Sequence, residues 1–401
     1  MGVDNVGCLF LLTRPSLYKA AHFEKRNIVS RASRQFRILI VIRSLGGGGA
    51  ERVAVDLAEY WTANGMRVTI ATRADESSDA YVLPDSVERV VLGLAQESRG
   101  LMEGLSLNLR RVWRLRRLIR RTRPDVVLGM MTTSSVLAVL AASGLGCRVI
   151  ATEHTHPPVQ SISGLWKRLR RWAYPRAARV VTLTSGTAAW VEAHLPGSKV
   201  AVIPNAVRWP LVQAEPVVEP PARDGRLRLL AVGRLHSLKG FDLLIEAFAR
   251  VAQQLPEWDL VILGEGALRE TLQRQIDELG LAERVSMPGR VGNVGQWYEQ
   301  SDLYVLSSRA EGLSNTLLEA MASGLPCVAF DCDTGPREII RPDIDGVLVR
   351  PSGDVQALAD QLADMMAHKH KRQWYGLRAV DVLERFSPAR VTRLWDEQLR
   401  D

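Results

Sequence analysis

The sequence predicts an α/β protein with two parallel-sheet domains, on the basis of three observations. Short apolar runs alternate with helical patterns along most of the chain, which is typical of parallel sheets covered by helices. A proline-rich segment at 210–226 interrupts this alternation, which then starts again. The length of 401 residues suits two domains of about 150–200 residues, each with its own core.

The apolar runs predict the order of the strands. In the first domain, strands are expected at 37–42, 67–72, 125–130, 148–152 and 179–184. In the second domain, they are expected at 227–233, 259–264, 284–289, 303–308, 326–330 and 346–349. Ligands of open parallel sheets bind outside the carboxyl ends of the strands, so we expect a cleft where these ends of the two sheets face each other.

The chain accordingly divides into five segments. The last of them is expected to be a helix that crosses back to the first domain, with Ser387 as its N-cap and Pro388 at its first position. The first is an extension whose apolar run VGCLFLL is short and follows an acid, which makes it a poor secretory signal. The segments are the extension (1–36), the first domain (37–209), the linker (210–226), the second domain (227–385) and the C-terminal helix (386–401).

Composition limits the class of protein. No segment reaches ~18 consecutive apolar residues, so a transmembrane helix is not expected. The four cysteines have no metal-binding spacing and are expected to be reduced thiols, which suggests a cytoplasmic location. The net charge of +8 is concentrated between Arg110 and Arg123, where eight arginines occur without an acid, and in KRLRR (167–171). Such basic stretches point to phosphates of nucleotides, of an anionic membrane or of nucleic acid.

The run EGLSNTLLE, from Glu311 to Glu319, is the most informative motif. It follows a predicted strand and opens a helical stretch (315–324) that ends at Gly324. A carboxylate just before this helix start, and another two turns later, suit the hydroxyl groups that flank a phosphate. The unpaired amides of such a helix start bind anions, and here they belong to Leu313, Ser314, Asn315 and Thr316. The motif therefore predicts a nucleotide-sugar site.

A glycine-rich loop, GGGGAER (46–52), follows the first predicted strand and opens a helix. Its glycines, Gly47 and Gly48 among them, let the backbone approach a ligand closely and leave amides free. We expect the loop to form a wall of the cleft that faces the diphosphate or the acceptor. Two alternatives are a plain tight turn and a dinucleotide site with Asp75 near the ribose, although Glu51 stands where that fingerprint requires its third glycine.

Two cations follow the first strand of the second domain, in the loop of VGRLHSLKGFDLLIEAF (232–248). Arg234 and Lys239 lie there at the carboxyl end of the strand, where they can neutralise a diphosphate leaving group. The alternative is a solvated basic loop. The nearby helix start at Glu311 favours phosphate contact.

These motifs carry a family resemblance. GRL-x3-KGFDLLI, followed by EGLSNTLLEAMASGLPCV and preceded by VIPNAV (202–207) at the domain edge, resembles the retaining glycosyltransferase family 4, of GT-B fold. The resemblance covers roughly residues 37–401. It implies two Rossmann-like domains facing each other across a cleft, with the C-terminal helix crossing back to the first. DCDTGPREII (331–340) resembles the enzymes that use UDP-sugars to build bacterial surface polysaccharides or lipid-linked oligosaccharides.

The resemblance implies a role for each matching donor-site residue. Arg234 and Lys239 hold the diphosphate. Glu319 accepts hydrogen bonds from the ribose, and Glu311 contacts the hydroxyls of the donor sugar. The backbone amides from Gly312 to Thr316 bind the phosphates.

Two further positions follow from the resemblance. Arg290 lies where the family binds the base, mostly through backbone atoms. His154 matches a first-domain position that faces the transferred sugar, and the alternative is that it bridges the backbone of its own loop. Asp331 and Asp333 form a D-x-D that binds metal in the other nucleotide-sugar fold, but the family resembled needs no metal, so they are expected to line the donor loop.

The segment LSLNLRRVWRLRRLIRRTR (105–123) predicts a helix with a basic stripe. Its expected core positions are Leu105, Leu109, Val112, Leu115 and Ile119, and its stripe is Arg110, Arg114, Arg117 and Arg121. A second helix, GLWKRLRRWAY (164–174), places tryptophans such as Trp166 beside arginines such as Arg170, which suits a membrane interface. We expect these helices to bind the cytoplasmic leaflet of an anionic membrane or the pyrophosphate of a lipid-linked acceptor. Solvated surface and nucleic acid are the alternatives, and nothing resembles a nucleic-acid-binding module.

The predicted function is that of a retaining glycosyltransferase, cytoplasmic and peripheral at the inner face of the cell membrane. It would move a hexose or N-acetylhexosamine from a UDP-sugar to a hydroxyl of a lipid-linked glycan in polysaccharide biosynthesis. No cofactor is expected, because the nucleotide-sugar is a substrate and the basic loop supplies the counter-charge. The alternatives are a cytosolic synthase that acts on a soluble sugar and a non-catalytic nucleotide-sugar-binding protein.

Overall fold

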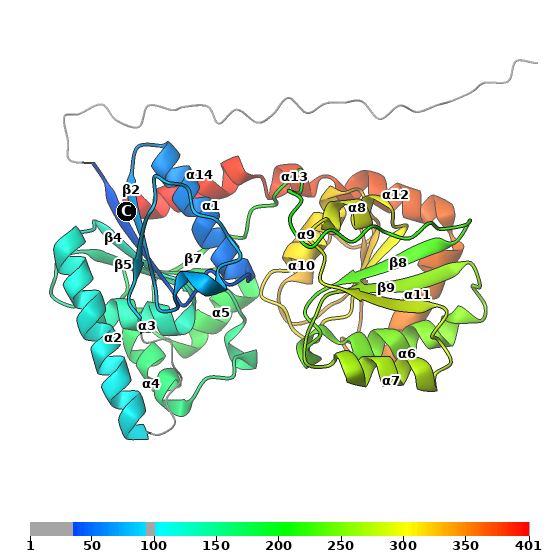
Figure 1. Ribbon diagram of the computed structural model, residues 1–401, viewed down its shortest axis with the longest axis horizontal. Coiled ribbons are helices and arrows are strands. Elements are labelled where there is room, and N and C mark those ends of the chain that lie inside the picture. Colours follow the sequence, from blue (N-terminus) through cyan, green and yellow to red (C-terminus); the bar gives the residue numbers. More distant parts are fainter. Residues whose placement is uncertain (1–34, 94–100, 401) are drawn as a thin grey trace, which may run out of the picture. The chain divides into compact units, whose positions relative to one another are not determined.

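The computed structural model describes residues 35–93 and 101–400, so nearly all of the expected N-terminal extension lies outside the described residues. The described residues form one compact unit, which contains two parallel sheets. We call the part built on β1–β7 the first lobe and the part built on β8–β13 the second lobe (Figure 1). The predicted architecture of two parallel α/β sheets is confirmed.

The first lobe has a seven-stranded sheet of order β3-β2-β1-β4-β5-β6-β7. The order reverses between β1 and β4, and ligands of such sheets bind at this point, outside the carboxyl ends. The strands are β1 (Arg37–Ile42), β2 (Arg67–Thr72), β3 (Glu88–Val91), β4 (Val126–Gly129), β5 (Arg148–Glu153), β6 (Arg179–Thr182) and β7 (Val200–Val202). The helices are α1 (Gly49–Ala63), α2 (Leu101–Thr122), α3 (Met131–Ala142), α4 (Gly164–Ala173) and α5 (Ser185–His194), with short 3-10 turns η1 (Glu76–Ser78), η2 (Pro157–Val159) and η3 (Tyr174–Arg176).

The second lobe repeats this plan with a six-stranded sheet of order β10-β9-β8-β11-β12-β13. Its reversal lies between β8 and β11. The strands are β8 (Leu227–Val232), β9 (Trp258–Leu263), β10 (Val285–Gly289), β11 (Leu303–Leu306), β12 (Cys327–Phe330) and β13 (Val347–Val349). The helices are α6 (Phe241–Ala252), α7 (Arg269–Glu278), α8 (Val294–Glu299), α9 (Asn315–Ala322), α10 (Pro336–Ile339), α11 (Val355–Ala367), α12 (Lys369–Ala379) and α13 (Val382–Arg385), after the turn η4 (Ser237–Lys239).

Every predicted strand is present, but the sequence did not predict β3 and β7. Both lie at the edges of the first sheet, and their residues are only half-buried or exposed. An edge strand that is covered on fewer sides does not need the continuous apolar run that marks a central parallel strand. Between β7 and β8, residues 203–226 form neither helix nor strand.

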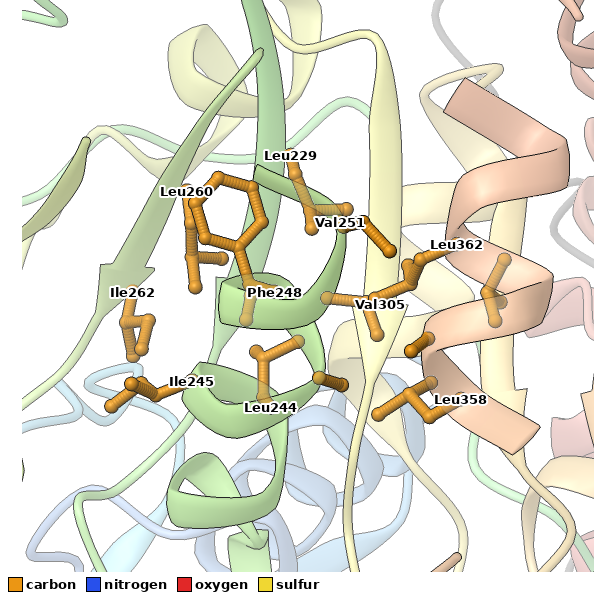
Figure 2. Close-up of a cluster of buried hydrophobic side chains, with 14 of the residues drawn as sticks. Leu229, Leu244, Ile245, Phe248, Val251, Leu260, Ile262, Val305, Leu358 and Leu362 are labelled. Atoms are coloured by element: carbon orange, nitrogen blue, oxygen red, sulfur yellow. The ribbon is translucent and has the colours of Figure 1, made fainter. Parts of the chain in front are cut away.

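The core of the second lobe explains why its sheet and helices hold together. Figure 2 shows Phe248 of α6 turned toward Leu260 of β9, and Leu362 of α11 near Val305 of β11. These side chains are almost fully buried. The apolar face of each helix thus covers the central strands, as the 3.6-residue spacing of the sequence predicts.

The last helix, α14 (Pro388–Arg400), packs on the first lobe, as predicted (Figure 1). Ser387 accepts a hydrogen bond from the Arg390 amide at 3.4 Å, which makes it the expected N-cap. The buried ring of Trp395 meets Trp61 of α1 edge-on, with ring centroids 6.2 Å apart. Asp396 accepts hydrogen bonds from the Trp61 indole at 3.2 Å and from the Tyr60 hydroxyl at 2.9 Å.

Replacing Trp395 by alanine is expected to lower the free energy of unfolding by about 3–5 kcal/mol, because it empties a large buried site between α14 and α1. Trp374 of α12 is the matched control, since its side chain is 54% exposed and its loss should cost much less. Chemical denaturation followed by circular dichroism measures both. Equal losses for the two variants would contradict the packing described for α14.

The prediction for α2 is correct for most of its core face and wrong for one residue. Leu115, Leu118 and Ile119 are buried against the first lobe, and Val112 packs beside them. Leu109 was expected in the core, but it is 61% exposed. In this turn of the helix the buried residue is Arg111. The side chain of Leu105 lies outside the described residues.

Candidate functional site

Most of the predicted site residues come from loops that follow strands at the two points where the sheet order reverses, whereas His154 follows β5 and Arg290 follows β10. The glycine loop follows β1, and the loop of Glu311 follows β11. The two lobes meet at these loops. Gly312 lies so close to the His154 carbonyl oxygen that a Cβ at this position would collide with it. His154 and the Glu311 loop, which the sequence placed in different domains, are therefore neighbours.

Lys239 and Glu311 form an ion pair in the second lobe. The Lys239 ammonium lies 2.5 Å from Glu311 Oε1, and the Ser308 hydroxyl donates to the same oxygen at 2.6 Å. The Glu311 side chain is 10% exposed and that of Lys239 is 24% exposed. Lys239, which was predicted to hold the diphosphate, is thus in direct contact with Glu311, which was predicted to hold the sugar.

The turn that carries Lys239 is anchored to the end of β11. Gly240 has φ +62°, and a side chain there would collide with the Ser307 carbonyl oxygen, so the position requires glycine. Ser307 donates to the Lys239 carbonyl at 2.9 Å, and Arg309 forms a two-pronged ion pair with Asp242 at 2.8 and 2.6 Å. These contacts hold the backbone of Lys239 beside Glu311.

Arg234 lies at the carboxyl end of β8, in the same loop. Its side chain is exposed and has no hydrogen bond or ion pair within the part of the chain that the structure describes. Arg290 is likewise exposed, just after β10. Both residues therefore lie at the carboxyl edge of the second sheet, where the sequence placed them.

Glu319 lies inside the second turn of α9, where it is nearly buried. Its Oε1 accepts from Arg52 of α1 at 2.6 Å, and its Oε2 accepts from the Tyr298 hydroxyl at 3.3 Å. Burial raises the pKa of Glu319, and the Arg52 guanidinium opposes this shift. Arg52 is a site residue that the sequence did not predict. The only signal for it is its place in the first turn of the helix that follows the glycine loop.

The start of α9 is where the sequence predicts it. The helix begins at Asn315, and Ser314 is its N-cap, whose hydroxyl accepts from the Leu317 amide at 3.4 Å. The amides of Asn315 and Thr316 are therefore the helical donors, whereas the Leu313 side chain is buried in the core. Gly324 ends the helix with φ +77°, as expected.

The starts of α9 and α1 meet across the lobes. Asn315 Oδ1 accepts from Asn205 at 2.8 Å, and a Cβ on Gly49 would lie 3.1 Å from Asn315 Nδ2. The backbone of Gly47 has φ +98°, which favours glycine. Gly48 is the N-cap of α1, and the Glu51 carboxylate folds back against it. An acid already occupies this helix start, so the Gly48 amide is less open to a diphosphate than the sequence suggested.

His154 follows β5 and is a strong candidate for ligand contact. Both of its ring nitrogens are buried and have no hydrogen-bond partner among the described residues. Burial lowers the pKa of His154 to about 4, so the ring is neutral near pH 7. His156, in contrast, is 3.2 Å from the Thr187 hydroxyl. Of the two histidines, His154 is the one whose two ring nitrogens are both buried without a partner among the described residues.

A buried network lies directly behind His154. Glu153 is fully buried and accepts from Tyr174 at 2.5 Å, from Thr132 at 2.9 Å and from Gln160 at 2.7 Å. Gln160 also donates to the Thr155 carbonyl at 2.8 Å. Burial raises the pKa of Glu153, and these hydrogen bonds act against that shift. The network fixes the loop that carries His154.

Arg170 belongs to this network, so its predicted role at a membrane or acceptor is wrong. The guanidinium is 3.6 Å from Glu153, donates to Gln160 at 3.0 Å and stacks over Trp190. Its side chain is only 5% exposed. Trp166 is half-buried and packs on the core of the first lobe, and the exposed tryptophan of α4 is Trp172. The helix turns Arg170 inward, where its guanidinium lies beside the buried carboxyl group of Glu153.

Replacing Arg170 by alanine is expected to lower the free energy of unfolding by about 3–5 kcal/mol, because Glu153 would stay buried without its cation. Arg171, the exposed neighbour on the same helix, is the control, and its alanine variant should change stability by about 0.5 kcal/mol or less. Urea denaturation of both variants tests this. An Arg170 variant as stable as the Arg171 variant would show that Glu153 needs no counter-ion.

The helices α2 and α4 both pack on α3 (Figure 1). Both carry exposed basic residues. The predicted stripe of Arg110, Arg114, Arg117 and Arg121 is exposed. It is not wholly without acid, because Glu88 of β3 lies 3.8 Å from Arg121. We define the tryptophan–arginine surface as Leu109, Arg110, Trp113 and Arg117 of α2 with Leu165, Lys167, Arg168, Arg171 and Trp172 of α4, all exposed.

Asp331 is not placed as a metal ligand. Its buried carboxylate forms ion pairs with Arg337 at 2.8 Å and with Arg350 at 2.5 Å. Asp333 is exposed, and its carbonyl oxygen lies near Gly186 of the first lobe. Of the two acids, only Asp333 lies at the contact between the lobes.

Two family models match adjoining parts of the chain. Residues 47–208 match the model described as Glycosyltransferase Family 4, and residues 215–379 match the model described as glycosyl transferases group 1. The division between them falls between β7 and β8, and so each model covers one lobe.

Relatives with similar sequences are enzymes of glycan synthesis. The chain is 32% identical to an exopolysaccharide phosphotransferase of Streptomyces coelicolor over 71% of its own length, but it spans only 29% of that relative. It is 26% identical to an amylovoran biosynthesis glycosyltransferase of Erwinia amylovora, over 91% of this chain and 99% of the relative. It is also 26% identical to a Campylobacter jejuni α-1,4-N-acetylgalactosaminyltransferase named for an undecaprenyl-diphosphate-linked acceptor, over 81% and 88% of the two chains.

Solved structures share the fold. A sucrose-phosphate synthase of Thermosynechococcus elongatus superposes with a TM-score of 0.78 at 18% identity, over 92% of this chain and 98% of that one. The Anabaena protein HepE, solved in complex with UDP, superposes with a TM-score of 0.74 at 20% identity, over 91% and 100% of the two chains. Both lobes, the helix that crosses back and the two family models agree. The chain therefore belongs to glycosyltransferase family 4 and is a glycosyltransferase of the GT-B fold.

Proposed function

We propose that the enzyme transfers a hexose or N-acetylhexosamine from a UDP-sugar to a hydroxyl of a lipid-linked glycan in polysaccharide biosynthesis. The observation that carries the donor half is the grouping of Lys239, Glu311 and Glu319 around the start of α9, beside the loop of His154, whose ring nitrogens have no partner among the described residues. A cation, an amide-rich helix start and two carboxylates match a diphosphate flanked by two hydroxyl-bearing groups. The UDP complex of the similarly folded HepE supports UDP as the nucleotide.

The proposed chemistry uses positioning and charge stabilisation. The bond between the sugar's anomeric carbon and the diphosphate breaks, and a bond to the acceptor oxygen forms on the same face. The departing phosphate oxygen takes the acceptor's proton. Lys239 and Arg234 stabilise the negative charge that develops on the diphosphate, and the amides of Asn315 and Thr316 assist. Glu311 is engaged by Lys239 and Ser308, which suits a fixed sugar contact rather than a nucleophile.

Glu319 and His154 hold the two ends of the donor in this proposal. The Glu319 carboxylate accepts from the ribose hydroxyls. The neutral imidazole of His154 can both donate and accept a hydrogen bond, so it suits a sugar hydroxyl. The proposed transfer uses no metal. Cationic side chains supply the counter-charge, and Asp331 is already paired with Arg337 and Arg350.

The acceptor half of the proposal rests on two observations. One relative is named for an acceptor attached to undecaprenyl diphosphate. The tryptophan–arginine surface combines exposed tryptophans with exposed arginines, a composition that binds the interface of an anionic leaflet. No helix among the described residues is both long and apolar enough to cross a bilayer. We therefore propose peripheral attachment to the inner face of the cell membrane, where the basic face also lies close to lipid phosphates.

A donor screen tests this function. UDP-sugars and GDP-sugars are incubated with the enzyme and a membrane extract, and nucleotide release is measured with and without a chelator. Release from one UDP-sugar that depends on the lipid fraction, and that survives the chelator, is the expected result. Full turnover with a soluble sugar alone would replace the lipid-linked acceptor by a soluble one. Tight UDP binding with no turnover of any donor would contradict catalysis.

A further inference from the structure

An ion pair joins the two lobes beside the proposed ribose position. Arg52 lies in the first turn of α1, and Glu319 lies in α9, and their side chains meet at 2.6 Å. The Glu319 side chain is 8% exposed and that of Arg52 is 33% exposed. The buried acid belongs to the second lobe, and the cation that meets it belongs to the first.

Glu319 needs a cation if it is to stay ionised. Burial raises its pKa, so at a given pH a larger share of the carboxyl is protonated than in water. The titratable groups that face it are Arg52 from α1, Tyr298 from α8 and Tyr304 from β11. Burial raises the pKa of both tyrosines well above the usual value, so they stay neutral. The charge that stabilises the carboxylate therefore comes from Arg52.

The ionised form is the one that a ribose requires. A carboxylate only accepts hydrogen bonds, and its two oxygens offer about four acceptor positions. Arg52 uses one position on Oε1, and Tyr298 uses one on Oε2. The remaining positions suit two neighbouring hydroxyls. A protonated Glu319 would lose acceptor capacity and would turn one oxygen into a donor.

We propose that Arg52 is a positioning residue of the donor site, which keeps Glu319 charged and oriented for the ribose of a nucleoside diphosphate. This role rests on the proposed function of the site. It also ties nucleotide affinity to closure of the lobes, because the guanidinium reaches Glu319 only when α1 and α9 are in contact. The hydrogen bond from Asn205 to Asn315 beside it does not involve Arg52 and remains in a variant.

The test is the pH dependence of UDP binding, measured by calorimetry between pH 5 and 8. Arg52→Gln is expected to weaken UDP binding at least tenfold at the acid end and to move the acid limb of binding to higher pH. The reason is that the pKa of Glu319 rises further without the guanidinium. Arg52→Lys should restore part of the affinity. At saturating donor, kcat of Arg52→Gln should stay within about threefold of wild type, because the arginine does not touch the reacting atoms.

Two controls separate this role from a general effect. Arg250→Gln removes an exposed arginine whose partner, Glu246, lies one turn away on the same helix, and it should leave UDP binding unchanged. Glu319→Gln should abolish the difference in pH profile that Arg52→Gln makes, and adding Arg52→Gln to it should cost little more. An Arg52→Gln enzyme with wild-type affinity and pH profile overturns the role of Arg52 alone. A wild-type enzyme that binds no UDP overturns the proposed donor and this role together.

Discussion

Lys239→Ala is expected to lower kcat for transfer by about 10²–10³, the cost of removing one preorganised charge from a developing anion. The ammonium of Lys239 lies 2.5 Å from Glu311, at the place proposed for the diphosphate. Glu311→Ala should lower kcat to a similar degree, because the donor sugar loses its fixed contact. Initial rates of nucleotide release, with the UDP-sugar found in the donor screen, measure both effects.

The control for this pair is Lys371→Ala. Lys371 forms an ion pair with Asp364 in the same lobe. The side chain of Lys371 is 34% exposed and that of Lys239 is 24% exposed. This variant should keep wild-type rates, and circular dichroism should show all three proteins folded. A Lys239→Ala or Glu311→Ala enzyme that retains a rate within about threefold of wild type would exclude that residue from the donor site.

Removing four charges from the tryptophan–arginine surface is expected to weaken binding to anionic vesicles by about 10³. The variant changes Arg110 and Arg117 of α2, and Arg168 and Arg171 of α4, to glutamine. Each basic residue near an anionic leaflet contributes about 1 kcal/mol, so four of them correspond to roughly three powers of ten. All four are exposed, so the fold should be kept. Flotation with vesicles of defined anionic lipid content measures the loss.

The matched control removes the same charge elsewhere. Arg250, Arg274, Arg393 and Arg400 are also exposed, and the glutamine variant of these four should float like the wild type. Turnover of a short soluble acceptor should be equal in all three proteins. If both quadruple variants lose vesicle binding equally, net charge alone accounts for it and the surface on α2 and α4 has no special part. If neither loses it, the proposed membrane contact is wrong.

Most of the proposed donor site could be predicted from the sequence because its signals are local. A strand, a turn and a capped helix follow one another within a few residues, so the position of Glu311 before α9 and that of Glu319 within it follow from spacing alone. The loop of Lys239 has the same character, since Gly240 is required where it passes the Ser307 carbonyl. Parallel topology then brings the ends of β8 and β11 to one edge.

The errors have a common cause. Leu109 and Arg170 were assigned from helical periodicity, which gives the angle of a residue around the helix but not the surface on which the helix rests. The helix α4 lies over a buried carboxylate, so an arginine faces inward and Trp172 faces outward. Edge strands such as β3 were missed for a related reason. Their burial depends on neighbouring elements that cannot be identified from the local sequence.

The sequence by itself determined the two α/β lobes, the helix that returns to the first lobe and the places of Lys239, Glu311 and Glu319 along their loops and helix. These depend on apolar periodicity, caps and glycines, whose effects act over a few neighbouring residues. Only the tertiary structure decided that Arg52 pairs with Glu319, 267 positions away, and that Glu153 draws Arg170 out of the solvent. The physical reason is that the partner of a buried carboxyl group comes from the element that packs over it. Which element packs there depends on the tertiary packing and not on the neighbouring sequence.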